Sequence, residues 1–214
     1  MIRLGTLFSG IGAIEQALLR MNLKHSLVFA CDNGELDLKL LPSDEQNEYD
    51  NLKKITKKNI TEEESRRLYV LRQKEEETIS KIAHYVSQLP SIHDKKTYVD
   101  NLYETHSKGE NHVKQTYLAN YDINEDDFHL DVHFLDGRDY ANRVDMMVGG
   151  SPCQSFSSNG KRGGFEDTRG TLFHEYARII SEVQPKCFIF ENVRGMLCHL
   201  ELSMLISKYF DHYF

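Results

Sequence analysis

The 214-residue sequence lacks the features that mark membrane, secreted and metal-binding proteins. No apolar run approaches the ~20 residues that a membrane-spanning helix needs. The start, Met1 to Phe8, has no signal-peptide pattern of a basic region, a long apolar stretch and a cleavage site. The four cysteines show no paired spacing, which favours a reduced, cytoplasmic setting. His129 and His133 fall in a segment expected to be loop or strand, so we expect no metal site.

Positive charge is also scarce, since the formal net charge is −7. This value excludes a protein coated in basic residues, but a local positive groove can still bind nucleic acid on an acidic protein. With 40% hydrophobic residues, the chain can bury the core of one ordinary domain and not of two large ones.

Glycine is absent from Glu35 to Lys108, a densely charged stretch that contains Pro42 and Pro90. Ser43–Gln46 and Thr61–Glu64 match the pattern of capping boxes that open helices. Interleaved charges of both signs are typical of a solvated helical surface. We therefore predict a helical insertion that either has a structural or partner-docking role or contacts DNA directly. Its apolar residues fall on one helical face: Leu68, Leu71, Ile79, Ile82, Val86 and Leu89.

The segments before this stretch predict the opening unit of an α/β nucleotide-binding domain. Residues 2–8 and 26–30 are short apolar strand candidates, and residues 13–19 have apolar side chains at helical spacing. Ser9-Gly10-Ile11-Gly12 joins the first strand to the helix, and Cys31-Asp32 ends the second strand. A strand, a glycine turn, a helix, a strand and an acidic residue in this order are typical of doubly wound α/β folds.

The α/β pattern resumes after the insertion, from about His112. Residues 144–148 and 186–190 predict buried strands, and residues 168–183 predict a helix between them. Cys153 follows the first of these strands, at the sheet edge where such folds place their chemistry.

A nucleophilic cysteine needs backbone amides or positive charge to lower the pKa of its thiol. The turn after Pro152 could supply amides to Cys153, and Lys161 and Arg162 could supply charge. Residues 157–165, which follow Cys153, fit either a loop that closes over a phosphate backbone or an ordinary surface loop. The other cysteines lie in or beside apolar segments and are expected to be buried and inert: Cys31, Cys187 and Cys198.

Glu191-Asn192 ends the next predicted strand. A carboxyl group in an apolar setting keeps its proton more readily and can donate it to a ring nitrogen. A helix cap is the alternative interpretation of Glu191 when it is taken alone.

Taken together, these segments resemble the cytosine carbon-5 DNA methyltransferase family. Three motifs occur in order, each at a predicted strand end: Phe8-Ser9-Gly10-Ile11-Gly12, Gly150-Ser151-Pro152-Cys153-Gln154 and Phe190-Glu191-Asn192-Val193. Residues 164–173 and 115–121 match the family further, so the resemblance covers residues 1–34 and about 113–200. It implies an incomplete, doubly wound, Rossmann-like S-adenosylmethionine-dependent methyltransferase fold. Its catalytic domain would comprise residues 1–34 and 113–214, with residues 35–112 as the helical insertion.

The resemblance implies roles for particular residues. Asp32 would bind the ribose hydroxyls of S-adenosylmethionine, and Asp131, or alternatively Asp136, would contact its adenine. The other residues of the implied cofactor site are Phe8, Gly10, Ile11, Gly12, Pro152 and Leu172. The implied substrate-binding residues are Gln154, Ser157, Lys161, Arg162, Arg169 and Asn192.

The implied reaction is methylation of a cytosine flipped out of duplex DNA. Cys153 would add to carbon-6 of the ring while Glu191 donates to nitrogen-3, which makes carbon-5 nucleophilic. A base would then remove the carbon-5 proton, and the thiolate would leave. Such enzymes belong to bacterial restriction-modification systems and act on the nucleoid.

The family's Gln-x-Arg-x-Arg motif, target-recognition domain and C-terminal Gly-Asn motif have no counterpart in the sequence. We therefore expect a fragment or one subunit of a split enzyme, completed by a second chain or a C-terminal part. Two alternatives remain open: a relative that methylates transfer RNA, and a catalytically silent chain whose insertion docks a partner.

Overall fold

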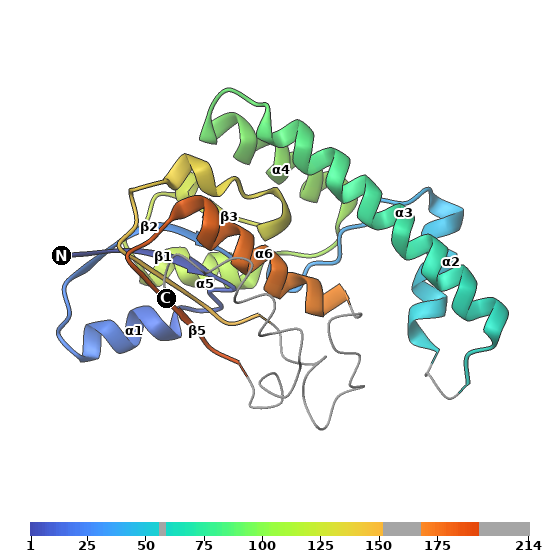
Figure 1. The fold of residues 1–214 in the computed structure, drawn as a ribbon, viewed down its shortest axis with the longest axis horizontal. Helices are drawn as coiled ribbons and strands as arrows, with labels where there is room; N and C mark the ends of the chain where they lie inside the picture. The colour runs from blue at the N-terminus through green and yellow to red at the C-terminus, as the bar shows by residue number, and fades with distance from the viewer. Residues whose placement is uncertain (56–58, 152–167, 193–214) are drawn as a thin grey trace. The chain divides into compact units, whose positions relative to one another are not determined.

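The computed structural model describes residues 1–55, 59–151 and 168–192, with side chains in the last segment from residue 172 onward (Figure 1). The chain divides into two compact units. One comprises Met1–Glu35 with Glu110–Phe214, and the other comprises Leu36–Gly109.

The first unit is built on a five-stranded sheet in the order β3-β2-β1-β4-β5, and each neighbouring pair is parallel. This arrangement confirms the predicted doubly wound α/β fold. The strands are β1 (Ile2–Leu7), β2 (His25–Cys31), β3 (Phe128–His129), β4 (Met146–Gly149) and β5 (Cys187–Phe190). The helices of this unit are α1 (Ala13–Arg20), α5 (His112–Asn120) and α6 (Thr168–Val183), with 3₁₀ turns η1 (Glu125–Asp127), η2 (Val132–Phe134) and η3 (Gly137–Tyr140).

Helices α1 and α5 share one face of the sheet. Leu18 of α1 packs on Leu4 and Val148, while Tyr117 of α5 packs on Ala30 and Phe128. Leu27 contacts both clusters, so the two helices lie on the same side.

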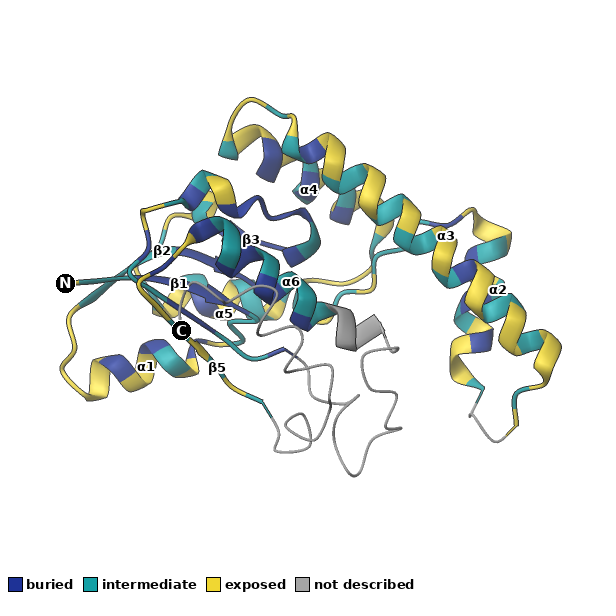
Figure 2. Ribbon diagram, viewed as in Figure 1, coloured by how far each residue is buried: buried dark blue, intermediate teal, exposed yellow. Residues whose placement is uncertain are grey.

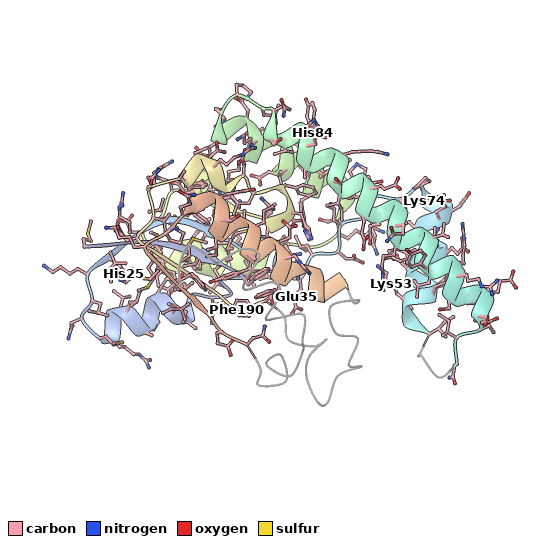
Figure 3. The ribbon with its side chains drawn as sticks, viewed as in Figure 1. His25, Glu35, Lys53, Lys74, His84 and Phe190 are labelled. Carbon is pink, nitrogen blue, oxygen red and sulfur yellow. The ribbon has the colours of Figure 1, made fainter. Side chains whose placement is uncertain are left out.

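Helix α6 covers the opposite face. A Cβ atom on Gly149 would lie 2.9 Å from the ring of Tyr176, which shows how closely this helix approaches the end of β4. The ring of Phe190 stands 5.1 Å from Phe173 and 4.8 Å from Tyr176, so α6 also packs on β5 (Figure 3).

A β-bulge in β2 sets which side chains reach the α1/α5 face. Leu4 pairs with Leu27, but Gly5 pairs with Phe29, so Val28 is the extra residue of the bulge. Without a bulge, Leu27 and Ala30 would point to opposite faces, because side chains alternate along a strand. With it, both join the clusters under α1 and α5.

The second unit consists of three helices, α2 (Ser43–Lys54), α3 (Glu62–Ser87) and α4 (Ile92–His106). Helices α2 and α3 enclose their own apolar cluster of Leu41, Tyr49, Leu52 and Leu71. The Tyr49 hydroxyl donates to Glu75 of α3 at 2.9 Å. Lys53 of α2 lies over the Tyr49 ring at 4.3 Å, and Lys74 of α3 pairs with Glu45 (Figure 3).

One of the two predicted capping boxes is confirmed. Thr61 caps α3: its hydroxyl accepts from the Glu64 amide, and the Glu64 carboxylate accepts from the Thr61 amide. The box at Ser43 is wrong, because Pro42 is the N-cap of α2 and gives no side-chain cap. Proline has no N–H for the box to satisfy, and the Gln46 side chain accepts from the amide of Leu41 at 3.1 Å.

The apolar face predicted for this stretch is only partly buried. On α3, Leu71 and Val86 are buried, whereas Leu68, Ile79 and Ile82 are half-buried and Leu89 follows the helix. Figure 2 shows α3 as a mixture of buried, intermediate and exposed residues. Among the described residues, no helix combines the length and the apolar character needed to cross a membrane.

Candidate active site

The glycine turn after β1 adopts backbone conformations that favour glycine. Phe8, Gly10 and Gly12 have φ angles of 53°, 53° and 86°, in the left-handed region. Among the described residues, no atom lies within 4 Å of the position that a Cβ on Gly10 would take, so no described side chain fills the space beside this residue. Ile11 is 63% exposed at the same turn. The turn can therefore admit a ligand against its backbone.

Asp32 lies at the end of β2, beside this turn. Its carboxylate accepts from the Gly10 amide and from the Gly34 amide, both at 2.8 Å. The Asp32 amide donates to the carbonyl of His129 at 3.0 Å, which ties this residue to the end of β3. A carboxylate has about four lone-pair positions, so two amide bonds leave it able to accept from ligand hydroxyls.

Asp131 follows β3 and caps η2. Its carboxylate accepts from the amide of His133 at 3.0 Å and pairs with Nδ1 of the His133 ring at 2.7 Å. The alternative, Asp136, is buried and bound by the guanidinium of Arg138 at 2.8 and 2.9 Å. Asp131 thus stands at the same sheet edge as Asp32, while both oxygens of Asp136 are engaged by one arginine.

The ends of β4 and β5 bring two of the family-like motifs into contact. The Glu191 amide donates to the carbonyl of Gly149 at 2.9 Å. The side-chain nitrogen of Asn192 donates to the Ser151 carbonyl at 3.1 Å. A Cβ on Gly150 would meet the carbonyl of Glu191 at 2.8 Å and its carboxylate at 2.9 Å. Only glycine lets the segment before Pro152 lie so close to Glu191.

Glu191 itself is exposed. The apolar surroundings that the sequence suggested for its carboxyl group are therefore not provided by the described residues. The side-chain nitrogen of Asn192, a residue expected to contact substrate, donates to the main-chain carbonyl and the hydroxyl of Ser151. That contact holds the ends of β4 and β5 together.

Several predicted site residues lie outside the described part of the chain: Pro152, Cys153, Gln154, Ser157, Lys161 and Arg162. Arg169 belongs to the first turn of α6, where only the backbone is described, and Leu172 is half-buried in the same helix.

The remaining cysteines differ from one another. Cys31 is buried, and burial, together with the charges of Asp131 and Asp32, raises the pKa of its thiol well above the usual range. It is therefore an inert core thiol, as expected. Cys187 is exposed, contrary to expectation, because β5 lies at the edge of the sheet formed by the described residues. Cys198 lies outside the described residues.

The two histidines considered as metal ligands contact other side chains. His129 contacts the Tyr140 hydroxyl at 2.6 Å, and His133 contacts Asp131. In the described ranges, no set of three or more histidine, cysteine, aspartate or glutamate residues is placed to hold a metal ion.

Sequence reasoning missed the contacts that α5 makes with the glycine turn. The Tyr117 hydroxyl donates to the buried carboxylate of Glu15 on α1 at 2.5 Å, and the Tyr121 hydroxyl donates to the Gly12 carbonyl at 2.6 Å. Burial and the Glu15 charge raise the pKa of Tyr117 well above its usual range, so its hydroxyl remains a donor. The only signal was the resemblance of residues 115–121 to a family segment.

Comparison with known proteins gives a family and several relatives. The model of the C-5 cytosine-specific DNA methylase family matches residues 95–208, more than half of the chain. The type II methyltransferase M.Eco47II of Escherichia coli is 56% identical over 69 residues, 32% of this chain and 16% of the relative. M1.ScrFI of Lactococcus lactis subsp. cremoris, also a type II methyltransferase, is 49% identical over 85 residues, 40% of this chain and 21% of the relative.

A third relative, the type II methyltransferase M.Sau96I of Staphylococcus aureus, is 59% identical over 56 residues, 26% of this chain and 13% of the relative. The aligned segments thus span only about a fifth or less of these relatives' own lengths.

Proposed function

The chain belongs to the family of C-5 cytosine-specific DNA methylases, and on that premise we propose that it forms the catalytic part of an enzyme that methylates carbon-5 of cytosine in DNA. The observation that carries the proposal is the contact between Gly149–Ser151 and Glu191-Asn192. The first segment leads directly into Pro152-Cys153. The main chain just before the proposed nucleophile is therefore hydrogen-bonded to the segment that carries the proposed acid.

The described residues fit S-adenosylmethionine as the cofactor. No described atom fills the position that a Cβ on Gly10 would take, and Phe8 and Gly12 also have left-handed backbone conformations in this turn. Asp32 and Asp131 follow neighbouring strands at the same sheet edge. This arrangement supports Asp32 as the ribose ligand and Asp131, rather than Asp136, as the adenine ligand.

When bound, S-adenosylmethionine supplies a methyl group on a positively charged sulfur that a carbon nucleophile can displace. The residues of the chain would create that nucleophile on the substrate. The Cys153 thiolate adds to carbon-6 of cytosine, and Glu191 donates to nitrogen-3, so that electron density develops at carbon-5. After methylation, loss of the carbon-5 proton restores the double bond and expels the thiolate.

DNA is the proposed partner, and the rest of the protein is the proposed source of target recognition. The three relatives above extend well beyond the segments they share with this chain. We infer that a further part of the polypeptide, or a second chain, reads the DNA sequence and completes the cofactor pocket. Lys161, Arg162, Gln154, Ser157 and Arg169 are the proposed contacts to DNA from this chain.

Cytosine analogues with fluorine at carbon-5 give the sharpest test. Because fluorine cannot leave as a cation where a proton would, the covalent adduct through Cys153 should accumulate and survive denaturation. We expect the full-length protein with S-adenosylmethionine to form this adduct on duplex DNA, and Cys153→Ser to lose both the adduct and turnover. Cys187→Ser is the matched control, because that thiol is exposed on β5.

Three results would contradict the proposal. An adduct in Cys153→Ser would remove Cys153 as the nucleophile. Modification of transfer RNA in place of duplex DNA would overturn the substrate. Absence of any methyl transfer by the folded full-length protein would overturn the enzymatic role.

A further inference from the structure

We propose that helix α5 is a bracket for the cofactor site, in which Tyr121 fixes the glycine turn and Asn111 fixes the main chain at Asp32. Both would be positioning residues for S-adenosylmethionine. The inference rests on the proposed function, because it takes the glycine turn and Asp32 as the two parts that hold this cofactor.

Tyr121 follows the last residue of α5 and reaches the turn between β1 and α1. Its hydroxyl donates to the carbonyl of Gly12 at 2.6 Å. A Cβ on Gly12 would lie 2.2 to 2.6 Å from the Tyr121 ring and hydroxyl, so the ring fills the space that a side chain there would need. Since Gly12 has a φ of 86°, this contact supports a backbone conformation that few other residues adopt.

Asn111 acts at the opposite end of the same helix. Its side-chain oxygen accepts from the Lys114 amide at 2.8 Å and so caps α5. Its side-chain nitrogen donates to the carbonyl of Asp32 at 3.0 Å. A Cβ on Gly34 would come within 2.3 Å of the same side chain, so Asn111 packs directly on the segment that carries Asp32.

Between these two ends, α5 is firmly attached to the domain. Tyr117 is fully buried, packs on Phe128 with a ring separation of 5.4 Å and donates to Glu15. The helix runs for nine residues, so it is a short rigid spacer between its two contacts. Because one end binds the turn and the other binds the Asp32 strand end, α5 sets how these two cofactor segments face each other.

Two substitutions remove the two hydrogen bonds one at a time. Tyr121→Phe keeps the ring and removes the hydroxyl bond to Gly12. Asn111→Ser keeps a good helix cap and removes the amide that reaches Asp32. Tyr69→Phe is the matched control, because Tyr69 is 63% exposed on α3.

Isothermal titration of the full-length protein with S-adenosylmethionine tests the bracket. We expect each of Tyr121→Phe and Asn111→Ser to weaken binding roughly three- to tenfold, the effect of one lost hydrogen bond. We expect KM for the cofactor to rise by the same factor with kcat little changed, and Tyr69→Phe to bind as the wild type does. A merely structural role would lower the melting temperature and leave the affinity of the folded protein unchanged.

The outcomes separate the bracket from the function on which it rests. Wild-type binding with unchanged affinity in either variant overturns the bracket and leaves the methyltransferase proposal standing. Failure of the folded wild-type protein to bind S-adenosylmethionine overturns the cofactor assignment, and the bracket with it. Backbone amide resonances of Gly10 and Gly12 give a readout that needs no cofactor, and the bracket requires them to shift in Tyr121→Phe but not in Tyr69→Phe.

Discussion

At the scale of single residues, the proposed site depends on side chains that satisfy backbone groups at strand ends. Asp32 accepts from two amides, Asp131 caps a 3₁₀ turn and Asn192 bonds to Ser151. Each therefore shapes the main chain and would also serve a ligand. Substitutions at these positions should be read with a stability measurement beside the binding measurement.

For Asp32, we expect replacement by alanine to weaken S-adenosylmethionine binding at least about tenfold, because charge-assisted hydrogen bonds to the ribose are lost, at roughly 1.5–3 kcal/mol. Calorimetry on the full-length protein measures this. Asp37→Ala is the control, since Asp37 is exposed and lies in the helical unit. Unchanged affinity in Asp32→Ala would show that another residue binds the ribose.

His133 gives a prediction about pH. Burial alone lowers the pKa of this histidine, but the Asp131 carboxylate, with a smaller contribution from Glu175 and against Arg178, raises it to about 9. The folded pKa thus exceeds the unfolded value of about 6.5. The pair should stabilise the fold fully below pH 6.5 and lose that contribution as the pH rises through 9.

Denaturant unfolding between pH 6 and 10 checks this expectation. Relative to His133→Gln, the wild-type free energy of unfolding should fall by roughly 2–3 kcal/mol across the range, somewhat less than the full shift because the ring is partly exposed. His25→Gln serves as the control in the same unit, since the His25 ring contacts only the Leu23 carbonyl among the bonds described for it. Parallel pH profiles for wild type and His133→Gln would contradict the assignment.

At the scale of elements, strand ends and motif positions were predictable from sequence, but contacts between distant segments were not. The apolar runs around Leu4 and Val148 mark strands because parallel strands are buried on both faces. The position of Glu15 in the core could not be foreseen, because its partner Tyr117 lies beyond the helical unit. The bulge at Val28 leaves no local signal either, since it depends on pairing with β1.

The helix starts show the same limit. Two similar sequence patterns, at Ser43 and Thr61, gave one capping box, because Pro42 supplies the fixed backbone angle but no amide for the first. We expect Thr61→Ala to lower the free energy of unfolding by about 1 kcal/mol. Ser43→Ala should leave it within about 0.5 kcal/mol, in the range of ordinary surface substitutions. Thermal or urea melts compare the two, and equal losses would contradict the assignment of the caps.

At the scale of the whole chain, we propose that the helical unit is an insertion that interrupts the catalytic domain. Within the catalytic unit, the chain leaves and returns at adjacent points, because the Asn111 side chain packs against Gly34. Within the helical unit, the Lys39 amide donates to the His106 carbonyl at 2.8 Å, so its entering and leaving segments are also paired. A short linker can therefore replace the unit without stretching the domain.

Replacement of residues 36–109 by a short Gly/Ser linker tests this proposal. The apolar side chains of α2 and α3 pack on one another, in the cluster around Tyr49 and Leu71, so their removal takes a core away together with its helices. Linker length adds little cost, since each doubling of a flexible loop adds only about 0.6 kcal/mol. We expect a folded domain with a cooperative thermal melt.

The cofactor site should survive the same replacement, because Asn111, Tyr117 and Tyr121 all lie after the removed residues. S-adenosylmethionine binding within about threefold of the full-length protein is the expected result, a change smaller than the loss of one hydrogen bond at the site. A variant with both the linker and Asn111→Ser also lacks the hydrogen bond from Asn111 to the Asp32 carbonyl, and it should bind the cofactor more weakly. Loss of a cooperative melt in the linker variant would show that the helical unit supports the catalytic domain, since exposing several core side chains at about 1.5–3 kcal/mol each is enough to unfold a marginal domain.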